Sequence, residues 1–214
     1  MLTMLEPETL VFVVDDDDSV RRALARLIRS AGHSVEVFAS AREFLAEVDV
    51  DARPACLVLD VQLPDLDGLQ LQRQLGATLP IIFLTGHGDI SMTVHAMKAG
   101  ATDFLTKPVR DIDLLRAIES ALESANQRYA NRCERDTLRQ RFNRLTPRER
   151  EVMALVVTGR LNKQVAGELG TAEKTIKAHR ARVMTKMEVT SLAQLVHIAD
   201  RGDIFSAGGT RRPA

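Results

Sequence analysis

Residues 58–68 read VLDVQLPDLDG, in which an apolar run stops at an acidic residue, Asp60. This run, residues 56–59, is one of five of strand length, and the others are residues 10–14, 35–38, 81–84 and 103–105. Amphipathic helical patterns separate the five runs, which indicates a parallel sheet with helices on both faces. Because crossovers are right-handed, the predicted fold class of this half is α/β, a flavodoxin-like doubly wound five-stranded parallel sheet.

Polar side chains follow these runs where each strand is predicted to end. Asp15 and Asp16 follow the first run, Asp60 the third, Thr85 the fourth and Lys107 the fifth. Ligands of an open parallel sheet bind at the carboxyl ends of its strands. We therefore expect three carboxylates, a hydroxyl and an ammonium to lie together at one edge.

Clustered carboxylates repel one another and need a cation unless they are protonated. Oxygen ligands with space for water and phosphate suit Mg²⁺. A carboxylate beside Mg²⁺ can attack phosphorus and become an aspartyl phosphate. Thr85 could then donate to one phosphoryl oxygen, and Lys107 could neutralise another. Asp17 and Asp18, which complete the acidic run, suit the first turn of the next helix.

The 214 residues carry no net charge, but the two halves differ. Residues 1–125 hold 11 basic and 20 acidic residues, a charge of −9, whereas residues 126–214 hold 18 and 9, a charge of +9. This asymmetry predicts two domains, of which the acidic one can hold a cation and the basic one can meet phosphate. No membrane span, secretory signal or metal-binding cysteine spacing is present, so we expect a cytoplasmic protein with reduced thiols and no membrane partner.

The pattern is helical from residue 111 onward. No Pro or Gly interrupts residues 111–145, so one long helix is predicted. Its distal, charged part is either a coiled-coil-like dimer seam or a solvated spacer, and the sequence leaves both open. The predicted organisation is a disordered N-terminus (1–9), a first domain (10–122), a helical linker (123–144), an all-α four-helix domain (145–204) and a disordered tail (205–214).

The four-helix domain has the pattern of a helix-turn-helix unit. Thr146 and Glu149 form a capping box at its start. A short helix at 162–169, a turn and a longer helix at 172–187, capped by Thr171, follow, and a last helix spans 191–200. The second helix of such a unit enters the major groove of DNA.

In that longer helix Ile176, Val183 and Met187 share an inward, apolar face. Lys177 and Arg182 could reach guanine edges, and two alanines beside them would allow close approach. Cations and hydroxyls on the flanks suit phosphate contacts. The predicted DNA-binding residues are Lys163, Thr171, Lys174, Thr175, Lys177, Ala178, Arg180, Ala181, Arg182 and Lys186.

Residues 10–122 resemble the receiver domain of two-component response regulators. The resemblance is carried by VVDDD at 13–17, VLDVQLPDLDG at 58–68, IFLTGHGD at 82–89 and AGATDFLTKP at 99–108. It implies that a sensor histidine kinase phosphorylates Asp60, and that Asp16, Asp60 and the Gln62 carbonyl bind Mg²⁺, with Asp15 acting through water. It also implies a phosphate-sensing Lys107 before a cis bond to Pro108, and a switch pair of Thr85 and Phe104. The usual aromatic there is Tyr, so Phe104 can act only by packing.

Residues 145–152, LTPREREV, with NKQVA at 162–166 and KTIKAHR at 174–180, closely resemble the LuxR-type DNA-binding domain. The whole chain from 10 to about 204 therefore resembles the NarL/FixJ class, in its FixJ/StyR-like branch. Ala178 and Ala181 depart from the bulkier or polar groups often found in the family, which leaves the target sequence undetermined.

The predicted function is a phosphorylation-activated transcription regulator, not an enzyme beyond Mg²⁺-dependent self-phosphorylation and slow autodephosphorylation. Residues 90–98 and 103–105 would form a homodimer surface after phosphorylation, and the dimer would bind double-stranded DNA. Two rivals remain. One is an Mg²⁺-dependent phosphotransferase or phosphatase, although Gln62 stands where haloacid-dehalogenase enzymes need Asp. The other is a receiver whose helical half binds protein.

Overall fold

The computed structural model describes residues 8–76, 78–86 and 90–201. They divide into two compact units, one up to Ala130 and one from Asn131, and each is described by itself. The predicted tail lies outside the described residues, as do residues 1–7 of the predicted N-terminal segment and residues 87–89, the end of the segment IFLTGHGD. Among the described helices, none combines the length and the apolar composition that crossing a bilayer requires.

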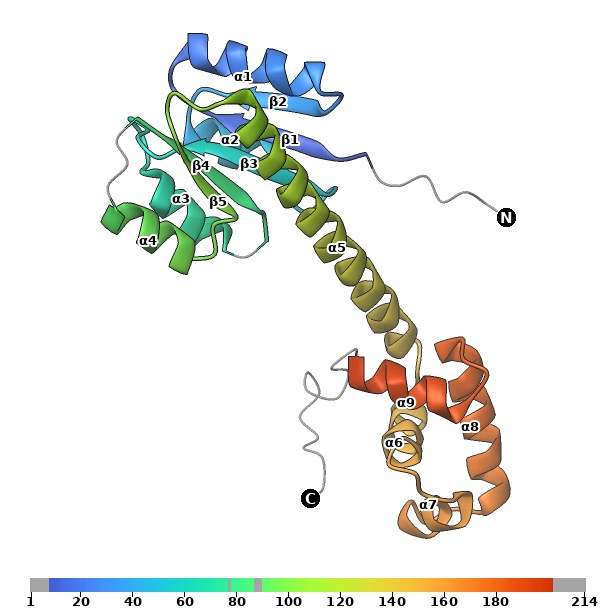
Figure 1. The fold of residues 1–214 in the computed structure, drawn as a ribbon. Coiled ribbons are helices and arrows are strands. Elements are labelled where there is room, and N and C mark those ends of the chain that lie inside the picture. The colour runs from blue at the N-terminus through green and yellow to red at the C-terminus, as the bar shows by residue number, and fades with distance from the viewer. Residues whose placement is uncertain (1–7, 77, 87–89, 202–214) are drawn as a thin grey trace. The chain divides into compact units, whose positions relative to one another are not determined.

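The first unit is built on a fully parallel sheet with the strand order β2-β1-β3-β4-β5 (Figure 1). Its strands are β1 (Leu10–Val14), β2 (Ser34–Phe38), β3 (Ala55–Asp60), β4 (Ile81–Thr85) and β5 (Asp103–Thr106). Its helices are α1 (Asp18–Ser30), α2 (Ala41–Glu47), α3 (Gly68–Leu75), α4 (Ile90–Lys98) and the first part of α5 (Asp111–Asn143). The five predicted strands are therefore confirmed, each with its bounds moved by no more than one residue.

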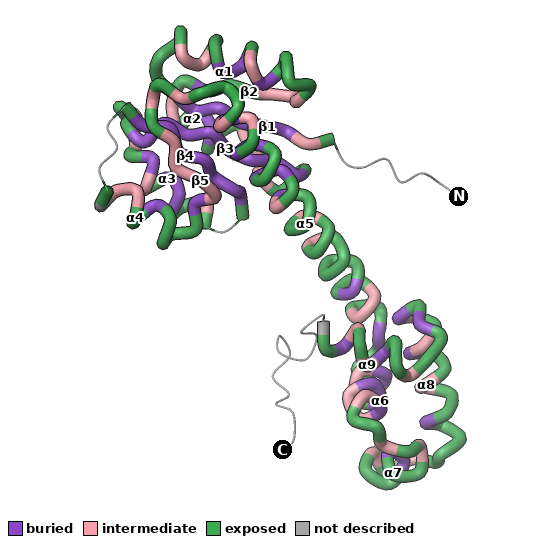
Figure 2. The backbone as a smooth tube through the Cα atoms, viewed as in Figure 1, coloured by how far each residue is buried: buried purple, intermediate pink, exposed green. Residues whose placement is uncertain are grey.

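The two faces of the sheet bury separate apolar clusters, and the central strands are buried along their whole length (Figure 2). Along β1, Phe12 faces the cluster that includes Phe44 of α2 and Leu71 of α3, while Val13 faces the cluster with Ile28 of α1 and Ile118 of α5. The alternation follows from the two-residue period of a strand. Helices on both faces explain why these strands are continuous apolar runs.

Local capping explains where the helices of the first unit begin. Asp17 is the N-cap of α1, and its carboxylate accepts from the backbone N–H groups of Ser19 and Val20. These two bonds lower the pKa of Asp17, with Val20 as the larger influence. Asp18 lies in the first turn, as expected for both acids, but Asp17 stands one position earlier than predicted. Ser40 is the N-cap of α2, and its hydroxyl accepts from the backbone N–H of Glu43.

The second unit is helical. It contains the end of α5 together with α6 (Pro147–Val156), α7 (Asn162–Glu168), α8 (Glu173–Met187) and α9 (Leu192–Arg201). The capping box of Thr146 and Glu149 is confirmed, and Ile176, Val183 and Met187 are buried in the core of this unit. The long helix over residues 111–143 is also confirmed, which leaves its role as seam or spacer a prediction.

One expectation in this unit is wrong. Thr171 was expected to cap α8, but the N-cap is Ala172 and no side chain caps the helix. The backbone N–H of Thr171 instead donates to the carbonyl of Ala166, 3.0 Å away, and closes the turn after α7. Gly170 permits this turn because its φ is 62°, a left-handed conformation that glycine adopts without strain.

Candidate functional site

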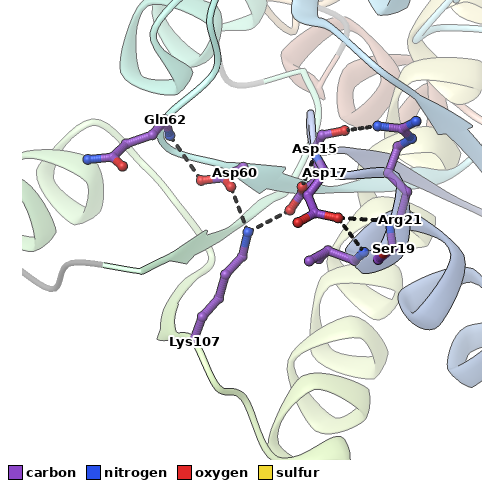
Figure 3. A network of polar contacts seen from close by, with 8 residues as sticks. Asp15, Asp17, Ser19, Arg21, Asp60, Gln62 and Lys107 are labelled. Carbon is purple, nitrogen blue, oxygen red and sulfur yellow. Dashed lines mark hydrogen bonds and ion pairs between the residues drawn. The ribbon is translucent and has the colours of Figure 1, made fainter.

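Lys107 joins two acidic side chains at the carboxyl edge of the sheet (Figure 3). Its Nζ lies 2.6 Å from Oδ2 of Asp15, at the end of β1, and 2.6 Å from Oδ2 of Asp60, at the end of β3. Asp15 is 1% exposed and Asp60 8% exposed, whereas Lys107 is partly exposed. The sheet thus brings together three residues that are up to 92 positions apart in sequence.

Burial and charge act against each other in this cluster. Burial is the largest influence on Asp15 and raises its pKa, although the hydrogen bond and charge of Lys107 and the Asp17 amide act in the opposite direction. For Lys107 burial is again the largest single influence and would lower the pKa. The hydrogen bonds and charges of Asp15 and Asp60 together outweigh it, so the pKa of Lys107 is raised. The ammonium is therefore held protonated while one carboxylate is only partly compensated.

The residues at this edge fit a divalent cation. Asp15, Asp16 and Asp60 each offer a carboxylate oxygen, and the three oxygens lie within 4.8 Å of one another. Asp16 is exposed and the other two are buried, so one side of the group faces water. Hard oxygen ligands beside solvent are the donor set that Mg²⁺ prefers. The backbone N–H of Gln62 donates to Oδ1 of Asp60 over 2.9 Å, which fixes the loop carrying Gln62 beside Asp60.

Thr85 and Phe104 lie on the two neighbouring strands β4 and β5. Thr85 is fully buried, and its carbonyl accepts from the backbone N–H of Lys107 over 2.7 Å. Phe104 is half-buried against Phe83, with 6.0 Å between ring centroids. The peptide bond between Lys107 and Pro108 is cis, as the resemblance implied.

Gly68 shows how closely the following loop packs beneath the site. A Cβ at this position would lie 2.8 Å from the carbonyl oxygen of Asp60 and 3.1 Å from Cα of Val61. The Gly68 N–H donates to the carbonyl of Val61 over 3.0 Å. Only glycine allows the start of α3 to approach the end of β3 this closely.

Two residues that the sequence analysis did not identify also hold this edge. Arg21 of α1 donates to the carbonyl of Asp15 over 2.7 Å. The carboxylate of Asp65, in the loop between β3 and α3, accepts from the backbone N–H of Arg42 over 2.9 Å and so helps to cap α2. Arg21 stands one helical turn after the acidic cap Asp17, which is a usable signal. Nothing in the local sequence points from Asp65 to a helix more than twenty residues earlier.

In the second unit, α7, a tight turn and α8 leave one face of α8 open. Most of the predicted contacts are exposed, and three are half-buried, Thr171, Arg180 and Lys186. Arg180 donates to Oδ1 of Asn162 over 3.2 Å, and Lys177 lies 3.5 Å from Glu173. The exposed residues among the predicted contacts are Lys163, Lys174, Thr175, Lys177, Ala178, Ala181 and Arg182.

Lys186 differs from the other predicted contacts because it is bound inside the unit. Its Nζ lies 2.7 Å from Oε2 of Glu149, a carboxylate that is 2% exposed. Glu149 also accepts from the backbone N–H of Thr146 over 2.9 Å. The hydrogen bond from Lys186 is the largest influence on Glu149 and, with those of Thr146, lowers its pKa despite burial. The capping box was visible in sequence, but its link to α8 was not.

Comparisons with known proteins agree with both units. Residues 11–119 match the response regulator receiver domain, and residues 143–199 match the LuxR family of bacterial regulatory proteins. The chain is 50% identical to nodulation protein W of Bradyrhizobium diazoefficiens over 92% of this chain and 88% of that one. It is 42% identical to the transcriptional regulatory protein FixJ of Rhizobium meliloti, over 90% and 95% of the two chains.

A solved structure of the response regulator StyR is similar over most of the chain. It shares 49% sequence identity, covers 91% of this chain and 99% of its own, and superposes with a TM-score of 0.82. The receiver and LuxR-type matches, in this order on one chain, are those of a transcriptional regulator and not of a metabolic enzyme. The chain therefore belongs to the response regulators that join a receiver to a LuxR-type DNA-binding domain, in the FixJ/NarL class.

Proposed function

We propose that Asp60 is the phosphoacceptor of this regulator and that a sensor histidine kinase is the donor. The observation that carries the proposal is the position of Asp60 at the end of β3, with Lys107 2.6 Å away and Asp15 on the same ammonium. A carboxylate oxygen of Asp60 would form a bond to phosphorus while the N–P bond of the kinase's phosphohistidine breaks. Lys107 would then pair with a phosphoryl oxygen in place of a carboxylate.

Asp15, Asp16, Asp60 and the main-chain carbonyl of Gln62 would hold Mg²⁺. When bound, the ion offsets the repulsion between the carboxylates and the phosphoryl oxygens. Water at the exposed side of Asp16 gives access for the slow hydrolysis that would reset the acceptor. This chain would therefore catalyse only its own phosphorylation and dephosphorylation.

The switch would act through Thr85 and Phe104. Thr85 would move toward the new phosphoryl group, and Phe104 would pack into the space left beside Phe83. The neighbouring helix α4 exposes Ile90 by 82%, Val94 by 43% and Met97 by 44%. Burial of these side chains against a second copy would make the homodimer.

The dimer would place two copies of α8 in adjacent major grooves of DNA. Lys177 and Arg182 would read base edges, with Ala178 and Ala181 allowing close approach. Lys163, Thr171, Lys174, Thr175 and Arg180 would contact phosphates. Lys186 would stabilise the fold and not contact DNA, because its ammonium is bound to the carboxylate of Glu149. Because its target is the chromosome, we place the protein in the cytoplasm.

Substitution of the acceptor tests this proposal. With beryllofluoride and Mg²⁺, the wild-type chain should dimerise in sedimentation velocity and bind more tightly to a genomic fragment selected by the protein itself. Asp60→Asn should do neither, because the phosphoryl mimic has no carboxylate to join. Asp67→Asn is the matched control, since Asn also caps α3. A response in Asp60→Asn would overturn the acceptor assignment.

The salt dependence of binding tests the DNA interface. Phosphate contacts release counterions, so log Kd should change steeply with log salt. Lys163→Ala should make the slope shallower by about one. A flat slope in the wild type would favour a helical unit that binds protein instead.

A further inference from the structure

The end of α5 is part of the DNA-binding unit. Leu138 is 5% exposed and Leu145 3% exposed, and Phe142 packs against the core of this unit. The helix that begins in the first unit therefore finishes as a packed element of the second. A change in the direction of this helix must therefore move the residues that its last turns contact.

Two arginines at the end of α5 and just after it contact the carboxylate of Glu188, at the C-terminal end of α8. Oε2 of Glu188 lies 2.6 Å from Nη2 of Arg141, and Oε1 lies 3.5 Å from Nη1 of Arg144. Arg141 also donates from Nη1 to the carbonyl of Met187 over 3.5 Å. One carboxylate oxygen and the carbonyl of Met187 at the end of α8 are thus engaged by Arg141 of α5, and the other oxygen by Arg144, just after α5. Arginine at this end also suits the helix dipole.

The backbone of Glu188 shows that this position is unusual. Glu188 ends α8 with φ 56° and ψ 45°, and it is the one non-glycine residue with positive φ among the described residues. Glycine or asparagine normally occupies such a position, because a side chain with a Cβ is strained there. A glutamate at a left-handed helix end therefore needs a reason in its side chain, and the contact with Arg141 supplies one.

We propose that Arg141 and Glu188 are positioning residues that fix the end of α8 to α5. Through this contact, a change in the direction of α5 after phosphorylation reaches the helix that reads DNA. The inference rests on the proposed function, since it assigns a path to the same response. Neither residue is placed at the DNA, because Glu188 caps the end of α8 opposite Lys174, and Arg141 of α5 contacts that end.

The key variant is Glu188→Gly in the full-length chain. It removes the carboxylate and also the strained conformation, so the end of α8 should remain folded. The measured quantity is the gain in affinity for the selected genomic fragment on addition of beryllofluoride. We expect this gain to fall by about fivefold or more, within the usual range of coupling between sites. Amide hydrogen exchange in α8 should match the wild type.

Charge variants distinguish a specific contact from a general charge effect. Arg141→Glu should reduce the gain to a similar extent, and adding Glu188→Arg to it should restore part of it by reversing the pair. Arg139→Glu is the matched control, because Arg139 is exposed on the same turn of α5 and makes the same change in charge. It should leave most of the gain intact.

Each outcome has a distinct meaning. If the wild type shows no gain with beryllofluoride, the proposed function fails and not this inference alone. If the wild type gains and Glu188→Gly gains equally, the contact only caps a helix and the inference is overturned. Weaker binding of Glu188→Gly in equal proportion with and without beryllofluoride, together with faster exchange in α8, would also overturn it.

Discussion

Asp15 in the receiver and Glu149 in the DNA-binding unit are both buried carboxylates bound by a lysine, yet their pKa values shift in opposite directions. Asp15 is 1% exposed with Lys107 at 2.6 Å, and Glu149 is 2% exposed with Lys186 at 2.7 Å. The pKa of Asp15 is raised, and burial is the largest cause. The pKa of Glu149 is lowered, and the bond from Lys186 is the largest cause.

The balance between burial and compensation explains the difference: burial outweighs the bonds to Asp15, whereas the bond from Lys186 outweighs burial at Glu149. Lys107 serves both Asp15 and Asp60, so each carboxylate receives only part of its charge, and the two acids also repel each other. The carboxylate of Glu149 has Lys186 to itself and also accepts from the backbone N–H of Thr146. A buried charge left partly compensated is suited to a ligand, whereas a fully satisfied one stabilises the fold.

Removal of Glu149 should have the largest effect on stability. Glu149→Ala loses the bond to Lys186 and the capping box, and should lower the free energy of unfolding of the second unit by about 2–3 kcal/mol. Glu149→Gln can keep the capping box, so it should lower it by only about 1–2 kcal/mol. Amide hydrogen exchange in α6 and α8 measures this unit separately. An unchanged exchange rate in Glu149→Ala would contradict a structural role.

The same pair predicts a pH dependence. The pKa of Glu149 lies below its ordinary 4.5 in the folded state, so its contribution is fully present above about pH 4.5. This contribution to stability should be lost as the pH falls through the lowered pKa that Glu149 has in the folded state. The calorimetric difference between wild type and Glu149→Gln should therefore be constant near neutral pH and shrink in acid.

Replacement of a glycine by alanine should have opposite effects on stability in the two units. Gly68→Ala places a methyl group 2.8 Å from the Asp60 carbonyl and should lower the stability of the receiver by about 1–3 kcal/mol, with loss of the beryllofluoride response. The matched control is Gly167→Ala in α7, where nothing lies within 4 Å of the new Cβ. It should stabilise the second unit by about 0.5–1 kcal/mol. Equal, small effects at both positions would contradict the tight packing at Gly68.

Much of the fold and of the receiver site follows from local sequence. An apolar run with polar residues at its end predicts both a strand and the edge on which its last side chain lies, so Asp15, Asp60 and Lys107 were expected to meet. The interior face of α8 was predictable for the same reason, since Ile176 and Val183 repeat at helical spacing.

Contacts between distant segments could not be predicted in this way. A lysine on the outer face of a basic helix looks like a DNA contact until its partner is known, and the partner of Lys186 lies 37 residues earlier. The role of Glu188 could not be predicted for a different reason. Local propensity argues against a left-handed glutamate, so only the folded contact with Arg141 accounts for it.

Asp15→Asn should give a small effect, with the opposite sign to Glu149→Gln. Ionised Asp15 is unfavourable in the fold, and an amide of the same shape can still accept from Lys107. In the absence of Mg²⁺ we expect the free energy of unfolding of the receiver to rise by about 1 kcal/mol, seen as slower amide exchange in β1 and β3. The same variant should bind Mg²⁺ more weakly, so the added ion should stabilise it less than the wild type. A fall in stability without Mg²⁺ would show that Asp15, like Glu149, serves the fold.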